Sequence, residues 1–252
     1  MSRILFVLLA LAALPAHADP ARKTAGLVEP RLGLQNHDGE APRVALTLDA
    51  CSGKVDRRIL DMLVRERIAA TIFVTARWLK RNPEAVTVLR AHPDLFEIED
   101  HGRDHLVAID RPISVYGVRS AGSPEALLLE VGGGADAIVA AGLGKPRWFR
   151  GATARYSRSA VASIQAMGYR IAGYSLNGDG GSLLGAKETA RRIAGAKDGD
   201  VIIAHINQPG HPAGSGVAEG ILTLRDRGFD FVLLRDAAEP AGAATHSVRL
   251  GK

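Results

Sequence analysis

Short apolar runs alternate with amphipathic stretches along most of this chain, the pattern of strands that are each followed by a helix. The runs are rich in Val, Ile and Leu and are bounded by polar residues, as buried strands are. The sequence predicts strands at Val44–Leu48, Ala70–Thr75, Leu95–Ile98, Arg147–Phe149, Arg170–Ser175, Val201–Ala204 and Phe229–Leu234. Helical spacing of apolar residues predicts helices at 55–63, 83–89, 124–143, 157–167, 187–196 and 217–227.

No hairpin signal separates these strands, and strand–helix–strand connections favour parallel pairing, so the sequence predicts an α/β fold. It is either a doubly wound sheet or a barrel of β/α units. No G-x-G-x-x-G follows the first strand, so a dinucleotide site is unsupported at that turn. The glycine run Gly132–Gly134 lacks the Lys-Ser/Thr of a phosphate loop. We expect it to break or kink its helix.

The first 18 residues have the pattern of a secretory signal peptide. Arg3 precedes an apolar run, Ile4–Leu14, and small residues follow up to Ala18, after which cleavage is expected. The run is shorter than the ~20 apolar residues that span a bilayer, and no later segment is long enough. We therefore expect a periplasmic or secreted protein without a membrane span. Residues 19–42 are predicted to be a loosely packed leader, 43–236 a single domain and 237–252 a tail.

Charge and cysteine content narrow the choice of partners. The formal net charge of +5 falls to +4 without the signal peptide, because Arg3 is its only charged residue. Bases alternate with acids, as in Asp56–Arg67, and form no run with interleaved aromatics, so nucleic-acid binding is not expected. Cys51 is the only cysteine, which excludes an intramolecular disulfide.

Polar residues follow several of the predicted strands, at the edge where β/α folds build their sites. His101 and His105 are four positions apart, a spacing that suits two imidazoles on one divalent metal. A single such residue is also explained as a helix cap or a loop residue, but a cluster at one edge favours a site. The candidate residues are Asp49, His101, His105, Arg150, Asp179 and His205.

These residues give the chain a resemblance to the polysaccharide deacetylases of carbohydrate esterase family four. The matching segments are Thr47-Leu48-Asp49-Ala50, His101-Gly102-Arg103-Asp104-His105, Arg150 and Ile203-Ala204-His205, with a looser echo around Asp179. The resemblance covers nearly all of Val44–Leu234. It implies a distorted (β/α) barrel of about seven parallel strands and a divalent metal, with zinc favoured, on the two histidines.

The resemblance also implies roles for the other residues. Asp49 corresponds to the general base, and Arg150 is expected to pair with it and keep it ionised. His205 is expected to protonate the leaving amine, and Asp179 to tune the pKa of His205. The substrate class implied is an N-acetylated glycan.

The chain departs from the family where Ala50 replaces the second Asp of the first motif, a metal ligand. Three outcomes remain open at this point. Asp49 moves to the metal; a nearby acid (Asp56, Asp100 or Asp104) substitutes; or two imidazoles and water hold the ion, or it is lost. Cys51 is either a small buried residue, a soft ligand near the metal, or in principle a nucleophile. On the first reading, Cys51→Ser should leave activity nearly intact.

The function predicted is metal-dependent hydrolysis of N-acetyl groups on an amino-sugar polysaccharide or peptidoglycan of the cell envelope. One alternative is a catalytically silent member of the same fold that binds glycans. The absence of the family's prolines after Arg150, together with Ala50, favours that reading. Another alternative is hydrolysis of a different C–N amide bond. The survival of an acid, a base and a histidine pair in one chain favours an enzyme.

Overall fold

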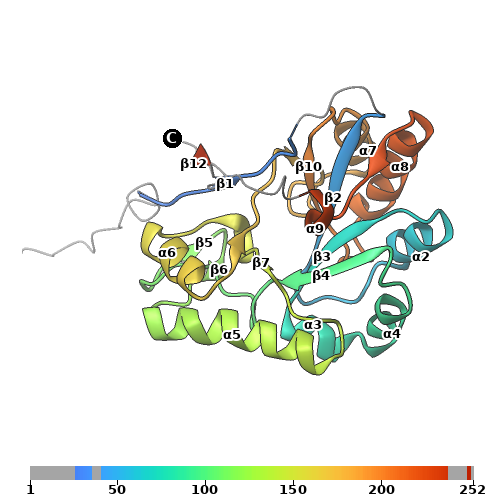
Figure 1. Cartoon of the computed structure of the whole chain (residues 1–252). Coiled ribbons are helices and arrows are strands. Elements are labelled where there is room, and N and C mark those ends of the chain that lie inside the picture. The colour runs from blue at the N-terminus through green and yellow to red at the C-terminus, as the bar shows by residue number, and fades with distance from the viewer. Residues whose placement is uncertain (1–25, 36–40, 238–248, 251–252) are drawn as a thin grey trace, which may run out of the picture.

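The computed structural model describes residues 26–35, 41–237 and 249–250 (Figure 1). The strands are β1 (Pro30–Arg31), β2 (Arg43–Ala50), β3 (Ala70–Val74), β4 (Phe96–Asp100), β5 (Ser114–Val115), β6 (Val118–Arg119), β7 (Trp148–Phe149), β8 (Arg170–Ile171), β9 (Leu176–Asn177), β10 (Val201–His205), β11 (Asp230–Phe231) and β12 (Arg249–Leu250). The helices are α2 (Arg57–Arg65), α3 (Ala76–Arg81), α4 (Pro83–Ala91), α5 (Pro124–Ala140), η1 (Ala152–Ala154), α6 (Arg158–Ala166), α7 (Ala186–Ala194), α8 (Ala213–Asp226) and α9 (Leu234–Ala237). The predicted signal peptide lies outside the described residues.

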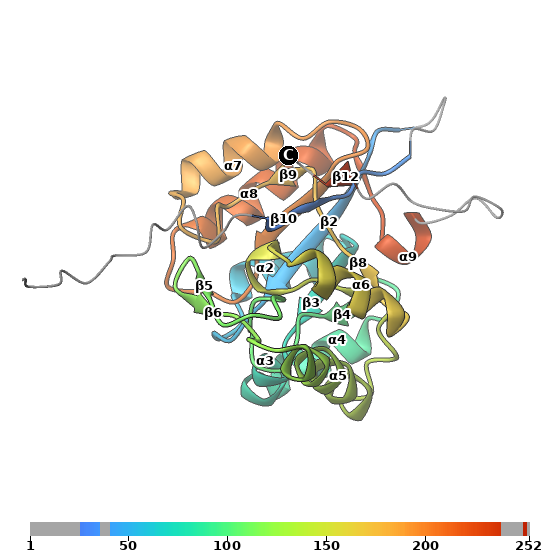
Figure 2. The same ribbon diagram turned by 90° about the vertical axis from the view of Figure 1, so that its left-hand side faces the viewer.

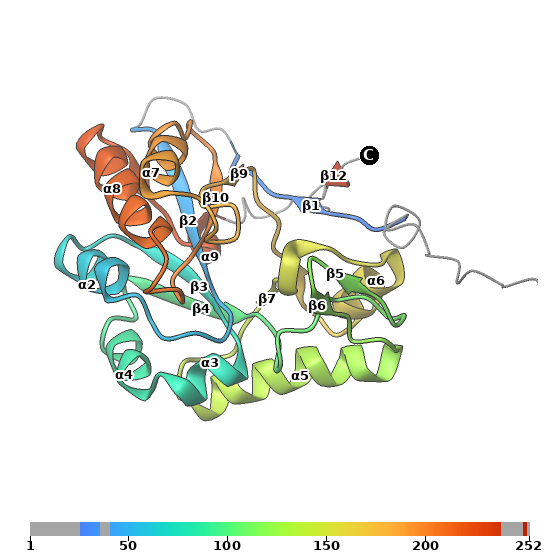
Figure 3. The same ribbon diagram turned by 180° about the vertical axis from the view of Figure 1, so that it is seen from behind.

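The central sheet has the strand order β8-β7-β4-β3-β2-β10-β9, and β11 pairs with the beginning of β2. Every pairing in this sheet is parallel, as the strand–helix alternation predicts. Helices surround the outer face of the curled sheet, with α7 packed beside α8 (Figures 1 and 3). The distorted (β/α) barrel of about seven strands in a single domain is therefore confirmed.

The two edge strands of this sheet are almost consecutive in the sequence. β8 ends at Ile171 and β9 begins at Leu176. At about 3.5 Å per residue, the chain between them spans roughly 18 Å at most. The sheet must curl to bring its edges that close, and Figure 2 shows the curl with α5 end-on. Among the described residues no hydrogen bonds pair β8 with β9, so the chain itself connects the edges. The prediction of a continuous strand over Arg170–Ser175 is wrong, because the chain leaves one edge of the sheet at Ile171 and joins the other edge at Leu176.

Residues 26–35 lie across the gap between the two edges. Val28 forms a bridge with Tyr156 on one side, and the N–H of Leu34 donates to the carbonyl of Gly199 on the other, at 2.8 Å. Val28 is only 2% exposed. The expectation of a loosely packed leader is wrong for this segment, because its backbone is hydrogen-bonded to Tyr156, Tyr174 and Gly199 and Val28 is buried.

The side chains of β2 alternate between two environments, as the period of a strand requires. Leu46, Leu48 and Ala50 belong to the apolar core that faces the surrounding helices. Thr47 and Asp49 lie on the opposite face, inside the barrel, where both accept hydrogen bonds from Arg150. Ala50 therefore points away from the barrel mouth.

Helix α5 runs without interruption through Gly132–Gly134, so the predicted break or kink is wrong. Gly134 serves close packing instead. A Cβ atom on Gly134 would lie 2.1 Å from Oδ1 of Asp100, whereas one on Gly132 would meet nothing within 4 Å. Only the former position requires glycine for space.

Several short elements have no counterpart in the sequence predictions, among them α3 and the β5–β6 hairpin. Helix α3 begins after Thr75, whose hydroxyl accepts the N–H of Trp78 as an N-cap. Strands β5 and β6 form a small hairpin that lies apart from the barrel (Figure 3). The last predicted strand shrinks to β11, after which α9 begins. Within the described part of the chain, no helix has the length and apolarity needed to cross a membrane.

Candidate functional site

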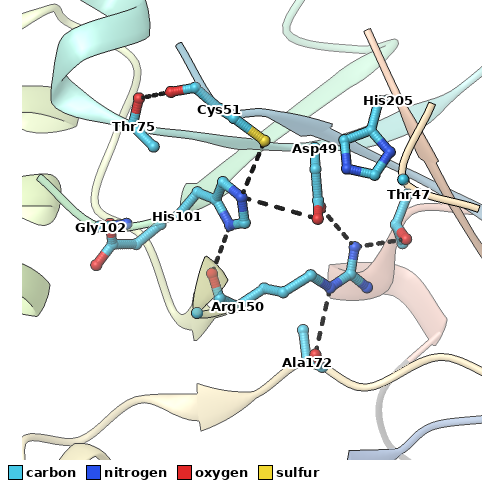
Figure 4. A network of polar contacts seen from close by, with 12 residues as sticks. Thr47, Asp49, Cys51, Thr75, His101, Gly102, Arg150, Ala172 and His205 are labelled. Carbon is cyan, nitrogen blue, oxygen red and sulfur yellow. Dashed lines mark hydrogen bonds and ion pairs between the residues drawn. The ribbon is translucent and has the colours of Figure 1, made fainter. Parts of the chain in front are cut away.

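A buried carboxylate and a buried guanidinium lie at the mouth of the barrel (Figure 4). Oδ1 of Asp49 accepts a hydrogen bond from Nη1 of Arg150 at 2.9 Å. Arg150 also donates to Thr47 and to the carbonyls of Ala172 and Gly173, and its guanidinium stacks 4.3 Å from the ring centre of Phe73. These contacts fix the guanidinium, so it orients Asp49 and stabilises its charge.

His101 follows β4 directly, and its environment fixes its tautomer. Its Nδ1 lies 2.6 Å from the carbonyl of Arg150. A carbonyl can only accept, so Nδ1 carries the proton and the neutral ring presents a free lone pair at Nε2. Nε2 lies 3.5 Å from Sγ of Cys51 and 3.8 Å from Oδ2 of Asp49. A carbonyl partner on the far nitrogen is the usual support of a metal-binding histidine.

Cys51 completes a group of three candidate metal ligands with His101 and His105, and their ligand atoms all lie within 4.8 Å of one another. In a tetrahedral zinc site, with Zn–S of about 2.3 Å and Zn–N of about 2.0 Å, sulfur and nitrogen lie roughly 3.5 Å apart. The Cys51–His101 separation matches that value. Three protein ligands with an open fourth position are typical of catalytic zinc, so these residues fit a divalent ion.

His105 lies on a loop that is hydrogen-bonded to a residue of α5. Its backbone is left-handed, with φ of 61°. On either side of it, the N–H groups of Asp104 and Leu106 donate to the buried carboxylate of Glu130, at 3.0 and 2.9 Å. A left-handed residue other than glycine is uncommon, and these bonds offset its cost. His105 thus reaches His101, with ring centres 5.1 Å apart.

His205 is the last residue of β10 and the register partner of Asp49. Both its backbone N–H and its Nδ1 lie against the carboxylate of Asp179, at 2.7 and 3.0 Å. The carboxylate accepts, so Nδ1 carries a proton and Nε2 is left for the pocket. This is the arrangement in which an acid orients a histidine for proton transfer.

The three alternative acids face elsewhere. Asp56 caps α2 and pairs with Arg58 at 2.5 Å. Asp100 accepts the N–H of Gly102 against α5, and Asp104 pairs with Arg103 near the surface. None of them belongs to the candidate ligand group, in which Cys51 is the third member beside the two histidines.

The electrostatics of the site favour a cation. Burial would raise the pKa of the Cys51 thiol, but hydrogen bonds with His101 and the other site histidines bring it well below its usual value. Burial would lower the pKa of His101, yet Asp49 and Cys51 raise it to about 9. The pKa of Asp49 is lowered, because Arg150 and the histidines outweigh the effect of burial. Cys51 and Asp49 therefore carry negative charge, and the extra proton on His101 occupies the lone pair of Nε2, for which a metal ion would compete, so metal binding should release that proton.

The site opens into a cavity of about 590 Å³. Glu29, from residues 26–35, forms part of its wall, where it pairs with Arg155 at 2.8 Å and accepts the hydroxyl of Tyr174. The cavity lining thus combines the candidate metal group, Asp49 and His205 with segments far away in the sequence.

The structure brings together all six candidate residues named from the sequence. Sequence reasoning gave Cys51 no firm role, because it aligned the ligand position with Ala50. The alternation of β2 was the available signal: Asp49 and Cys51 are two positions apart and share a face, whereas Ala50 does not. No local pattern points to Glu130.

Comparison with known proteins bears on the family and the fold. The profile of the polysaccharide deacetylase family matches residues 36–172, which is more than half of the chain. No curated protein matches the sequence.

Three solved structures show the same fold at low sequence identity. A family 4 acetyl xylan esterase from Clostridium thermocellum, in complex with a cobalt ion, is 23% identical with a TM-score of 0.61, over 77% of this chain and 89% of the other. The peptidoglycan deacetylase PdaC from Bacillus subtilis is 21% identical with a TM-score of 0.60, over 80% and 92%. A carbohydrate esterase family 4 pseudoenzyme from Bacillus anthracis is 18% identical with a TM-score of 0.59, over 79% and 66%.

Proposed function

This chain belongs to the polysaccharide deacetylase family, and on that premise we propose that it removes N-acetyl groups from an amino-sugar glycan of the cell envelope. The observation that carries the proposal is the convergence of Asp49, His205 and the Cys51–His101–His105 group on one cavity. Hydrolysis of an acetamide needs a base for water, an acid for the departing amine and an electrophile for the carbonyl.

Each group has a role that its contacts support. A divalent metal held by Cys51, His101 and His105 would supply the Lewis acid that polarises the acetamide carbonyl. Asp49 accepts the proton of the attacking water, and Arg150 keeps that carboxylate ionised and aimed. His205 donates a proton to the leaving nitrogen while Asp179 holds its ring. The products are acetate and a free amine.

We propose zinc as the metal, because a thiolate with two imidazoles is a soft ligand set that zinc accepts in tetrahedral geometry. This reverses the expectation that Cys51 is dispensable. We also propose export to the periplasm or the medium, on the pattern of the first 18 residues, which fractionation of cells that express the tagged full chain will test.

The experiment is acetate release by the zinc-loaded protein from chito-oligosaccharides, peptidoglycan and poly-N-acetylglucosamine. Wild type is assayed beside Asp49→Asn and beside Asp61→Asn, the same chemical change on the exposed face of α2. We expect activity in wild type and Asp61→Asn only. A protein with a full complement of zinc that releases no acetate from any of the three would overturn the proposal.

The pseudoenzyme reading retains specific support. A structurally similar protein from Bacillus anthracis is a pseudoenzyme, and Ala50 and the missing prolines after Arg150 are departures from the family pattern. Glycan binding without acetate release would establish that reading. A different acid released from an amide substrate would establish the other alternative.

A further inference from the structure

The two most exposed large apolar side chains among the described residues line the same cavity. Tyr116 is 79% exposed and Leu183 is 80% exposed, and both belong to the cavity wall. The other large apolar side chains that are exposed lie outside this wall and are less exposed. Exposed apolar side chains in the wall of a cavity are characteristic of a ligand-binding surface.

Tyr116 is presented by a rigid and strained turn. It lies at the tip of the β5–β6 hairpin, with φ of 50°, and Gly117 follows with φ of 80°. A two-residue turn of this kind favours Asn-Gly, and a bulky first residue costs about 1–2 kcal/mol. The hairpin is anchored by Val115, which is buried against Val107 and Ile109. Strain kept in an anchored turn indicates a role for the side chain that it displays.

Leu183 is presented by a loop that is hydrogen-bonded to Asp179, the residue that orients His205. Gly181 and Leu184 donate backbone N–H groups to the side chain and the carbonyl of Asp179, at 3.1 and 3.2 Å. Asp179 also orients His205, so Leu183 has a fixed position relative to that histidine. Left-handed conformations at Gly180, Gly181 and Ser182 turn the chain so that Leu183 stands out of the protein.

Among the described residues that line this cavity with Tyr116 and Leu183, none offers an unpaired charge outside the candidate centre. Within the part of the chain that the structure describes, the cavity's only other charged side chains, Glu29 and Arg155, pair with each other at 2.8 Å. The remaining polar lining consists of uncharged groups such as Asn177 and Gln208. Uncharged hydrogen-bonding groups between two apolar surfaces match a neutral sugar chain, whose rings have apolar C–H faces and polar edges.

We propose that Tyr116 and Leu183 are specificity-determining residues that hold the pyranose rings on either side of the reacting residue in an uncharged glycan chain. The inference rests on the proposed function and deepens it, since it makes an oligomer the preferred substrate. Tyr116 stacks on one ring and Leu183 contacts another, while the acetamide of the ring between them enters the centre.

The test compares kcat/KM for the dimer and the pentamer of N-acetylglucosamine. We expect Tyr116→Ala and Leu183→Ala each to lower the pentamer-to-dimer ratio, by roughly three- to tenfold for the aromatic residue, and Tyr116→Phe to restore it. Leu129→Ala removes an exposed apolar side chain of α5 outside the cavity and should leave the ratio unchanged. A ratio that is unchanged in both alanine variants overturns the inference.

A binding measurement separates this inference from the proposed function. Calorimetric titration of the pentamer into Asp49→Asn protein, with and without Tyr116→Ala, needs no catalysis. Weaker binding with the alanine supports the inference even where wild type releases no acetate, in which case only the proposed function fails. Acetate release by wild type together with equal pentamer binding by both proteins overturns the inference alone. Absence of both acetate release and binding overturns both.

Discussion

The carboxylate of Glu130 holds the loop that carries His105, because it accepts the backbone N–H groups of the residues on both sides of that histidine. The loop carries a candidate ligand in a left-handed conformation, and the helix that supports it contributes no ligand itself. The metal site that we propose therefore depends on a residue of α5 that never touches the ion.

The first prediction concerns that support. Glu130→Gln places an amide N–H against a backbone N–H, so we expect a loss of roughly 1–3 kcal/mol in the free energy of unfolding. We expect zinc affinity to fall roughly 10- to 100-fold, the usual effect of removing a group that orients a ligand. Urea unfolding and chelator competition measure the two. Glu125→Gln, in the exposed first turn of the same helix, is the control. Equal zinc affinity in both variants contradicts the role.

Cys51 provides the second prediction. Cys51→Ser should lower zinc affinity by about tenfold or more, because the thiolate is the anionic ligand of the group. Cys51→Asp restores a negative ligand and should recover metal binding, with a shift in preference toward harder ions such as Mn²⁺. Metal content by mass spectrometry after dialysis reports both. Undiminished zinc in Cys51→Ser would remove Cys51 from the ligand set.

The third prediction tests whether Asp49 acts as the general base or as a metal ligand. If it acts as the base, Asp49→Asn keeps its metal and loses roughly 10²- to 10⁴-fold in kcat. The Oδ2–Nε2 distance of 3.8 Å and the engagement of Oδ1 by Arg150 support this outcome. Zinc content and acetate release are measured on the same samples. Loss of the metal in this variant would make Asp49 a ligand instead.

The glycine run of α5 yields a matched pair. Gly132→Ala should stabilise the protein by up to about 1 kcal/mol, because its Cβ meets nothing and alanine is the better helix former. Gly134→Ala should destabilise it by several times that amount, since the new methyl overlaps Oδ1 of Asp100. Thermal unfolding of both variants measures these changes in stability. Equal effects would mean that α5 can move away from β4 at little cost.

Glu99 gives a dependence of stability on pH. It is buried inside the barrel, and burial, together with the neighbouring Glu97, raises its pKa to about 8. In the unfolded chain its pKa returns to about 4.3. Unfolding therefore releases a proton between these two values, and the stability contributed by protonated Glu99 is lost as the pH rises through that window.

Glu99→Gln removes this proton release, so its melting temperature should exceed that of wild type most at pH 8 and least at pH 5. Oε2 of Glu99 accepts the N–H groups of Arg147 and Trp148, and a glutamine carbonyl can do the same. A constant difference between the two proteins from pH 5 to pH 8 would show that Glu99 is ionised in the folded protein.

The residue pattern was sufficient to predict most of the barrel, because the buried strands are short apolar runs and parallel pairing follows from the intervening helices. It located Asp49, Arg150 and His205 because each lies at the end of a strand. To predict the role of Cys51 from the sequence, one must consider which side chains along β2 share a face, and a motif alignment does not use that information.

The features that the sequence did not predict depend on tertiary contacts. Glycine at position 134 suggests a helix break in the sequence, yet α5 is continuous there and packs so closely on Asp100 that a Cβ has no space. Glu130 supports the loop of His105 across 25 positions of sequence, and no periodicity reports such a contact. Val28 and Leu34 find their partners only once the sheet has curled.

That curl has a consequence for the order of assembly. The first segment that the structure describes, residues 26–35, forms backbone hydrogen bonds with Tyr156, Tyr174 and Gly199, in the second half of the sequence. These hydrogen bonds can form only after the partner residues have folded. We therefore expect residues 26–35 to dock after the strands have paired, at the high entropic cost of a long-range contact. Because Glu29 forms part of the cavity wall, the residues that are synthesised early complete the cavity only at the end of folding.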